Sequence, residues 1–230
     1  PVDATFLISN PNFSRDASTA AWTIVADNQN LSGGANENRC AESWKAAFTL
    51  SQELTLPNGV YALTAQAALT EYTVTGEDLP VVYANDVTTD VTTPFLAMLE
   101  GEDSMSKMSE QFSAGKYVVS PIFVEVTEGT LTIGVKGTRT DTWCIWDNFQ
   151  LTYYGTDVTV LELKAAQAVE DYKSALAAAK AVDQNAKMNT NLKAQFVSDL
   201  DTYAEDKVLT NEATKESIET ATAALNKITE

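Results

Sequence analysis

Histidine is absent from the 230 residues of this chain, and cysteine occurs only twice. Without histidine, the chain cannot form a Ser-His or Cys-His catalytic pair, or a zinc or iron site with histidine ligands. Two cysteines are too few for a four-thiolate metal site. These absences exclude the common nucleophilic hydrolases and most metalloenzymes.

Basic residues and long apolar runs are also scarce. Fifteen Lys and Arg residues stand against thirty-two Asp and Glu residues, which gives a net charge of -17 and an isoelectric point near 4.2. Such a chain is repelled by nucleic-acid phosphates and anionic lipids, so neutral or cationic partners are favoured and nucleic acid is not expected. No apolar run approaches the roughly 18 to 20 residues that cross a bilayer, so we expect no direct membrane insertion. The first residue is Pro1 rather than Met, and we expect that an upstream secretion signal has been removed.

The two cysteines, Cys40 and Cys144, leave two alternatives open. A disulfide between them would close a loop of about a hundred residues and contribute roughly 4 kcal/mol of stability. Alternatively, the two residues are free thiols buried in the core.

Residues 5–154 consist of short segments rich in β-branched and aromatic residues, separated by Gly, Pro, Asn and Asp. This pattern predicts an all-β unit whose strands suit a sandwich or jelly roll. The expected strands are 5–9, 22–26, 44–54, 60–69, 81–85, 117–126, 130–136 and 144–154. An Asn-Gly turn predicts a hairpin across residues 54–61, and a Glu-Gly turn predicts a second across residues 127–130. Residues 87–113 show a weaker pattern, which suggests a long irregular connection or a short helix, and we place the segment on a loop.

The segment 143–155 predicts the closing strand of this unit. With a period of two, alternate residues share one face of a strand. The two faces would then carry Ile145, Phe149 and Leu151 on one side and Trp146, Asn148 and Gln150 on the other. Asp147 interrupts the apolar row, and a carboxylate in a packed strand needs water, a hydrogen bond or a cation.

After Gly155 the composition changes to Ala, Lys, Asp and Glu with almost no Gly or Pro. Apolar spacings of four and three predict an amphipathic helix. Its inner face would carry Leu161, Ala165, Ala168, Tyr172, Ala175, Ala179 and Val182. Similar spacings predict a second helix around Phe196 and a third around Ile218, with connections short enough for antiparallel neighbours. We therefore expect two domains, an all-β jelly-roll sandwich over residues 1–155 and an all-α three-helix bundle over residues 156–230.

Three motifs stand in a fixed order along the first domain. Residues 6–14 read Phe-Leu-Ile-Ser-Asn-Pro-Asn-Phe-Ser and are followed by Trp22, residues 56–65 read Leu-Pro-Asn-Gly-Val-Tyr-Ala-Leu-Thr-Ala, and residues 146–155 read Trp-Asp-Asn-Phe-Gln-Leu-Thr-Tyr-Tyr-Gly. They resemble the galactose-binding-like jelly rolls of carbohydrate-binding module families 4, 9 and 22, as found in secreted and surface proteins of Bacteroides-type gut bacteria. The helical segment resembles, more loosely, the Ala-rich three-helix modules that act as spacers or adhesive units in cell-surface proteins.

The resemblance implies a structural calcium ion between the first and last strands. The related modules hold it with an acid that follows the first Phe motif, with backbone carbonyls and with an Asp of the last strand. Asp147 matches that Asp, whereas Ser14 stands where the other acid is expected. This replacement removes a charged oxygen from a cation that takes six to eight oxygen ligands. The alternative is that Asp147 accepts hydrogen bonds from backbone amides near Asn10 or Asn12.

The expected function is a non-catalytic glycan-binding module of an exported bacterial protein, with the helices as a spacer or docking unit and a host or dietary oligo- or polysaccharide as partner. A sugar presents apolar C–H faces and hydroxyl edges, so its site needs exposed aromatic rings beside groups that orient hydroxyls. The candidate rings are Trp143, Tyr72 and Tyr83, and the candidate hydroxyl partners are Arg139, Asn85 and Asp141. For each ring the alternative is packing in the core, and for Arg139 it is a surface ion pair with Asp141.

Two further hypotheses remain. The chain would alternatively be a structural or adhesive protein of the cell surface, whose domains bind another surface protein and carry no sugar site. An enzyme is the third hypothesis, because paired carboxylates hydrolyse glycosides without histidine, but the acids of this chain form no recognisable motif. An exposed ring beside amides and carboxylates would favour the glycan site, and an exposed apolar patch without polar partners would favour the adhesive role. In the first two hypotheses the protein is secreted or at the cell surface, where a lipid anchor would lie outside this chain.

Overall fold

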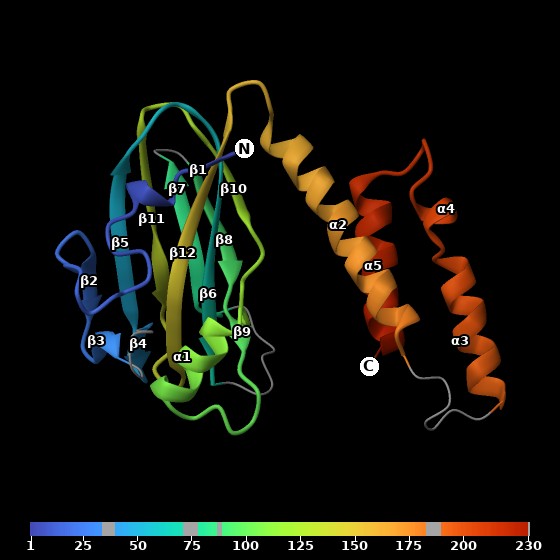
Figure 1. Ribbon diagram of the computed structural model, residues 1–230, viewed down its shortest axis with the longest axis horizontal. Helices are drawn as coiled ribbons and strands as arrows, with labels where there is room; N and C mark the ends of the chain where they lie inside the picture. Colours follow the sequence, from blue (N-terminus) through green and yellow to red (C-terminus); the bar gives the residue numbers. More distant parts are fainter. Residues whose placement is uncertain (34–39, 71–77, 87–88, 183–189, 230) are drawn as a thin grey trace. The chain divides into compact units, whose positions relative to one another are not determined.

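The computed structural model describes residues 1–33, 40–70, 78–86, 89–182 and 190–229. The chain divides into two compact units, Pro1–Thr159 and Val160–Glu230. The first unit contains two β-sheets and the second consists of helices (Figure 1). Among the described helices, none combines the length and the apolar character that crossing a bilayer requires.

The first unit is a sandwich of two sheets, which we call sheet A and sheet B. Within the described residues, sheet A has seven strands: β10, β6, β12, β4 and β3 in this order, with β1 beside β12 and β9 beside β6. Their bounds are β1 Val2–Asp3, β3 Gln29–Gly33, β4 Cys40–Trp44, β6 Gly59–Leu69, β9 Leu96–Ala97, β10 Ile122–Val126 and β12 Trp143–Gly155. Sheet B has five strands in the order β2 (Thr23–Ala26), β5 (Phe48–Thr55), β11 (Thr130–Gly137), β7 (Val81–Asp86) and β8 (Thr89–Pro94).

The core lies between the two sheets because their strands alternate apolar and polar side chains. In β5 the buried residues Phe48, Leu50 and Leu54 alternate with exposed or half-buried ones. The ring of Trp146 from β12 stacks on the ring of Phe48, with 5.1 Å between the centroids, and so joins the two sheets. A period of two also holds in β6, where alternate residues from Tyr61 to Leu69 belong to this core.

The two turns that the sequence assigns to hairpins connect the two sheets instead. The strands β5 and β6 flank the first turn and belong to different sheets, and so do β10 and β11, which flank the second. Both hairpin predictions are therefore wrong. The two turns contact each other, because the Leu56 N–H donates to the Gly129 carbonyl (2.9 Å) and the Gly129 N–H donates to Asn58 Oδ1 (2.8 Å). The local sequence is enough to predict that the chain reverses at each turn. Whether the next strand joins the same sheet or the other one depends on tertiary contacts such as this one.

Several element boundaries differ from the prediction. Residues 44–54, expected as one strand, form β4 and β5, and Lys45 between them has a positive φ of 49°. Residues 5–9, expected as a strand, contain the 3-10 helix η1 (Thr5–Leu7). The sequence does not predict β3 or β8.

The region placed on a loop contains a helix, α1 (Met105–Ser113). The loop assignment is therefore wrong, and the alternative of a short helix is confirmed. Its N-terminus is capped by Ser104, whose hydroxyl oxygen accepts a hydrogen bond from the Lys107 N–H (3.3 Å). One face of α1 buries Met108 and Phe112 in a cluster with Trp143 of β12. Figure 1 shows α1 lying against β12. The helix therefore covers the outer face of sheet A near the start of β12.

An irregularity in β12 changes the faces that the sequence predicts. The pairing of β12 with β6 shifts between Asp147 and Gln150, and Asn148 has a positive φ of 49°. Before the shift Trp146 lies in the core between the sheets, and after it Phe149 does. Ile145 lies instead in the cluster under α1. The prediction that Ile145 and Phe149 share a face is wrong, because a bulge reverses the alternation.

The second unit contains four helices within the described residues. They are α2 (Val160–Lys180), α3 (Thr190–Thr202), α4 (Glu205–Val208) and α5 (Lys215–Thr229), of which the sequence does not predict α4. The main apolar cluster joins α2 to α5 through Ala168, Tyr172, Ala175, Leu176, Ala179, Ile218, Ala221 and Leu225. The Tyr172 hydroxyl also donates to the Tyr203 carbonyl, which follows α3 (2.7 Å). Leu161 is exposed, so the buried face of α2 begins later than predicted.

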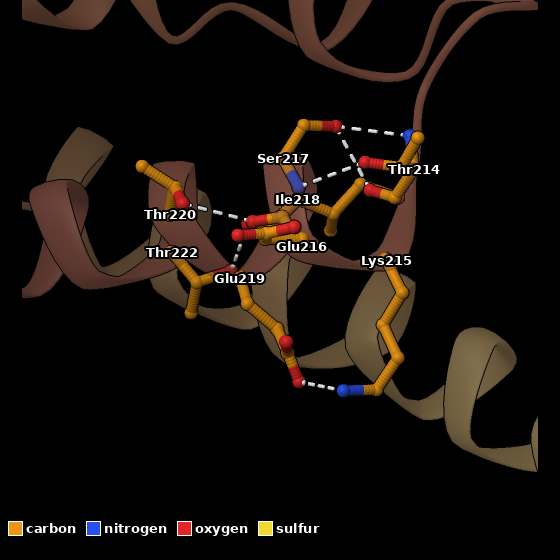
Figure 2. A network of polar contacts seen from close by, with 8 residues as sticks. All are labelled: Thr214, Lys215, Glu216, Ser217, Ile218, Glu219, Thr220 and Thr222. Atoms are coloured by element: carbon orange, nitrogen blue, oxygen red, sulfur yellow. Dashed lines mark hydrogen bonds and ion pairs between the residues drawn. The ribbon is translucent and has the colours of Figure 1, made fainter.

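The N-terminus of α5 is capped by side chains (Figure 2). The Ser217 N–H donates to the hydroxyl oxygen of Thr214 (3.2 Å), and the Thr214 N–H donates to the hydroxyl oxygen of Ser217 (3.0 Å). This reciprocal pair satisfies two backbone donors at the start of the helix, with Ser in place of the usual Glu or Gln. Lys215 and Glu219, one turn apart, form an exposed ion pair.

Candidate functional site

The start of β12 and the end of β4 place two tryptophans side by side. Trp143 and Trp44 are opposite each other in the antiparallel pairing of these strands. Their ring centroids are 5.9 Å apart and the rings are tilted by 55°. This pair lies at the end of the sandwich that also carries α1 (Figure 1).

Trp143, the first ring that the sequence proposes for a ligand, is buried. Only 2% of it is exposed, because Met108 and Phe112 of α1 belong to the cluster that covers it. Its Nε1–H donates to Glu42 Oε2 (2.6 Å). Burial raises the pKa of Glu42, and the hydrogen bond from Trp143 opposes this rise. The structure therefore corrects the expectation that the Trp143 ring is exposed.

Trp44 is not among the rings that the sequence indicates for a ligand. It is the exposed member of the pair, with 46% of its surface accessible. Its backbone is held on both sides by Asn28: the Trp44 N–H donates to the Asn28 carbonyl and the Asn28 side-chain amide donates to the Trp44 carbonyl, both at 3.0 Å. The next N–H, that of Lys45, donates to the Thr142 carbonyl (2.9 Å). The Lys45 Nζ lies 5.3 Å from the centroid of the Trp44 ring. The ring is thus a fixed, half-exposed platform.

Polar groups share the outer face of sheet A with Trp44. Glu42 stands two residues before Trp44 on β4, so both side chains point to the same face. Asn30 of β3 is directly opposite Glu42. A half-exposed indole beside amides and a carboxylate is an arrangement that contacts both the C–H face and the hydroxyl edge of a sugar.

Arg139 and Asp141 lie in the loop between β11 and β12, which ends at Trp143. Arg139 donates from Nε to Asp141 Oδ1 (3.1 Å) and from Nη2 to Asp141 Oδ2 (3.0 Å). The hydrogen bonds from Arg139 hold the pKa of Asp141 below its usual value. The structure therefore brings three sequence-proposed residues, Trp143, Arg139 and Asp141, to the end of the sandwich that carries Trp44.

Tyr83 and Asn85 lie elsewhere, on the outer face of sheet B. Both belong to β7, whose alternate residues Val82 and Ala84 face the core. Tyr83 is buried and its ring faces the Lys136 Nζ at 4.8 Å, whereas Asn85 is half-buried. Tyr72 lies outside the described residues. The proposed residues thus divide between two faces and do not form one cluster.

Asp147, the proposed calcium ligand, is fully buried. Its Oδ1 accepts a hydrogen bond from the Asn148 N–H (2.8 Å), and its Oδ2 has no hydrogen-bond partner among the residues that the structure describes. Burial raises the pKa of Asp147 to about 8, and the hydrogen bond from Asn148 opposes this rise. The alternative that Asp147 bonds to amides near Asn10 or Asn12 is also wrong, because its partner is the next residue of its own strand.

The residues around Ser14 do not fit a calcium ion. The Asn10 side-chain amide donates to the carbonyls of Ser14 (3.2 Å) and Ala17 (3.1 Å), so it occupies the carbonyl oxygens that a cation would use. The Ser14 N–H donates back to Asn10 Oδ1 (2.7 Å). Among the residues that the structure describes, no three acidic or cysteine side chains gather as metal ligands do. An amide thus stabilises the turn here, and the described residues offer no suitable ligand set for the calcium that the resemblance implies.

The two cysteines are free thiols, which decides between the two alternatives. Cys144 faces the core between the sheets, whereas Cys40 lies in the cluster under α1, on the opposite face of sheet A. Burial raises the pKa of Cys144 to about 12, so it is an unreactive core residue.

No protein-family model matches the chain, and no curated protein matches it. Among solved structures, TmCBM61 in complex with β-1,4-galactotriose is 19% identical, with a TM-score of 0.43, over 64% of this chain and 98% of that one. The CBM22-1 xylan-binding domain from Paenibacillus barcinonensis Xyn10C is 13% identical, with a TM-score of 0.38, over 65% and 95%. A cyclase from Fischerella sp. TAU, in complex with 4-(1H-indol-3-yl)butan-2-one, is 12% identical, with a TM-score of 0.43, over 69% and 100%. At these TM-scores the similarities carry no conclusion about ligand or reaction.

Proposed function

We propose that the sandwich, residues 1–155, is a non-catalytic glycan-binding module of an exported bacterial protein, and that Trp44 is its stacking platform. The observation that carries this proposal is the half-exposed Trp44 ring, fixed at its backbone and flanked by Asn28, Asn30 and Glu42. An indole contributes a large, rigid apolar surface at a low cost in conformational entropy. The neighbouring amides and the carboxylate supply donors and acceptors for hydroxyl groups.

The charge of the chain favours an uncharged glycan. At a net charge of -17, the protein repels polyanions at low ionic strength. Uncharged hydroxyl groups are not repelled by this negative charge, and the carboxylate of Glu42 accepts hydrogen bonds from them. Neutral oligo- or polysaccharides are therefore the proposed ligands.

The chemistry around Trp44 supports binding without catalysis. Hydrolysis of a glycosidic bond uses two carboxyl groups that flank the bond, one of which transfers a proton. Glu42 is engaged by the Trp143 indole, and Asp141 is engaged by Arg139 in a bidentate ion pair. Both carboxylates are thus held by neighbouring side chains, which suits a binding role.

The helical unit, residues 156–230, is proposed as a three-helix bundle of α2, α3 and α5 that acts as a spacer or docking module. The shared cluster of α2 and α5 and the hydrogen bond from Tyr172 to Tyr203 support this arrangement. A secreted or cell-surface location belongs to the same proposal, because polysaccharides of this kind are encountered outside the cell.

The test is a binding screen of the whole chain against neutral polysaccharides, including galactan and xylan, together with polygalacturonate as an anionic polymer. We expect retention by at least one neutral polysaccharide, no retention by polygalacturonate, and no release of reducing ends on prolonged incubation. Absence of binding across the panel would contradict glycan binding and favour a protein partner. Release of reducing ends would contradict the non-catalytic role.

A further inference from the structure

Sheet B carries a second feature that the Trp44 platform does not use, a pocket of about 250 Å³ on its outer face. Four polar residues line it, Thr49, Asp78, Lys136 and Thr138, together with the apolar residues Phe48 and Val81. Its residues come from the start of β5, from the start of β7 and the segment before it, and from the end of β11 and the residue after it. The pocket therefore lies on sheet B, whereas β4 and Trp44 belong to sheet A.

Strand register explains why these side chains meet. Lys136 of β11 is paired with Thr49 of β5 on one side and with Val81 of β7 on the other. Directly opposed residues of adjacent strands place their side chains on the same face. Because Leu50 and Val135, the neighbours of Thr49 and Lys136, face the core, this row faces outward. The row lines the pocket together with Asp78 and Thr138.

The position of Lys136 is defined by Tyr83, which lies in the next outward-facing row. The Lys136 Nζ is 4.8 Å from the centroid of the buried Tyr83 ring. The ring lies close to Gly134, where an added Cβ would be 3.0 Å from Tyr83 Cε1 and 1.9 Å from the Leu50 carbonyl oxygen. Gly134 is therefore required for this packing. An ammonium held over an aromatic ring loses less conformational entropy when it binds a ligand.

The size and lining of the pocket define the class of ligand. Pockets for drug-sized ligands usually measure about 300 to 1,000 Å³, so a pocket of about 250 Å³ suits a smaller group. Asp78 accepts hydrogen bonds, Lys136 donates them and the two threonine hydroxyls do both, while Leu79 and Val81 supply an apolar wall. A single sugar ring has this combination of hydroxyl edge and C–H face.

We propose that this pocket is a second carbohydrate subsite, which takes one sugar residue of the same neutral polysaccharide that binds at Trp44. This proposal rests on the proposed function. Two subsites on one module raise the apparent affinity for a long or branched polymer, because binding at the second becomes intramolecular. Tyr83 acts here as a positioning residue for Lys136 and does not contact the sugar.

The test compares three variants in titrations of the whole chain with the polysaccharide that the screen retains. Thr49→Val removes a hydroxyl at constant shape, and Lys136→Met removes the ammonium but keeps the stem. Thr132→Val is the matched control, because Thr132 lies on β11 with the same outward parity but does not line the pocket. We expect the first two to weaken binding at least about fivefold with unchanged melting temperatures, and the control to bind like the wild type.

A second measurement does not depend on the variants. In amide NMR spectra of the wild-type chain titrated with glucose, galactose, mannose and xylose, at least one of these sugars should shift the signals of Gly137 and Thr138. Unchanged affinity in Thr49→Val and Lys136→Met, with loss in Trp44→Ala, would overturn the second subsite and leave the proposed function intact. Absence of any binding by the wild type would overturn both.

Discussion

At the scale of single residues, Asp147 combines two properties that oppose each other. It is fully buried, yet within the described part of the chain its carboxyl group has one hydrogen bond, from the Asn148 N–H, and one oxygen without a partner. Removing a carboxylate from water disfavours its charged form, which is why the pKa of Asp147 rises to about 8. The folded protein therefore keeps this group largely protonated at neutral pH, and taking up that proton on folding lowers the free energy of unfolding.

The substitution Asp147→Asn should stabilise the sandwich at pH 7 and above. The pKa is about 8 when folded against a model value of 3.8, so the stabilising protonated form is complete below about pH 4 and is lost as the pH rises to 8. At about 1.36 kcal/mol per pKa unit, the variant should gain roughly 4 kcal/mol over the wild type at pH 7 and nothing at pH 4. Urea unfolding at both pH values measures this difference.

The exposed carboxyl of Glu53 on β5 provides the control for Asp147. Glu53→Gln should leave the free energy of unfolding unchanged, to within about 0.5 kcal/mol, at both pH values. Equal stability of Asp147→Asn and wild type at pH 7 would mean that Asp147 is solvated or ion-paired in the folded protein.

For the two tryptophans of the candidate site, the sequence alone does not determine which ring is exposed. Trp44 and Trp143 are directly opposed, and both stand at strand ends. Which ring is exposed depends on α1, which packs over Trp143, and the sequence predicts a loop where α1 forms. Without α1, the sequence assigns the exposed ring to Trp143, whereas the structure exposes Trp44.

At the scale of elements, the sequence predicts most strands, but neither the partners of each strand nor the faces of β12 after its bulge. The period of two in β12 fails at one position, where the bulge at Asn148 places Trp146 and Phe149 on the same side. A bulge has no reliable signal in a single sequence, because only the pairing with β6 reveals the extra residue. The turns after β5 and β10 are predicted correctly as reversals, but whether a reversal stays in one sheet depends on distant contacts.

The hydrogen bonds that cap the N-terminus of α5 can be tested by substitution. Thr214→Ala removes the hydroxyl that accepts from the Ser217 N–H, and should destabilise the helical unit by about 1 kcal/mol. Thr220→Ala on the same helix is the control, since Thr220 only donates back to the Glu216 carbonyl and Ala has the higher helix propensity. Thermal unfolding followed by circular dichroism at 222 nm compares them. A larger loss in Thr220→Ala than in Thr214→Ala would contradict the role of the cap.

At the scale of the whole molecule, the chain contains two separate hydrophobic cores. The sandwich has its own apolar core between sheets A and B, and the helical unit has a separate cluster centred on α2 and α5. The change in composition after Gly155 is visible in the sequence because strands and helices use different residues. The composition does not reveal the proposed glycan ligand in this way, because the proposed site depends on a few side chains.

A fragment of residues 1–159 should therefore fold and bind the retained polysaccharide with an affinity within about twofold of that of the whole chain. The reason is that all residues of both proposed subsites belong to the unit Pro1–Thr159. Isothermal titration of the two proteins measures this, and a fragment of residues 160–230 serves as the non-binding control. Loss of binding by the folded fragment 1–159 would show that the helical unit takes part in recognition.

The most direct test of the account is the affinity of Trp44 variants for the retained polysaccharide, measured by isothermal titration. Trp44→Ala should weaken binding at least about tenfold, or about 1.4 kcal/mol, and Trp44→Phe should weaken it less because part of the aromatic surface remains. Phe6→Ala removes another highly exposed aromatic ring, from η1, and should bind like the wild type. Wild-type affinity in Trp44→Ala, with its fold intact, would contradict the central claim that Trp44 is the platform for the glycan.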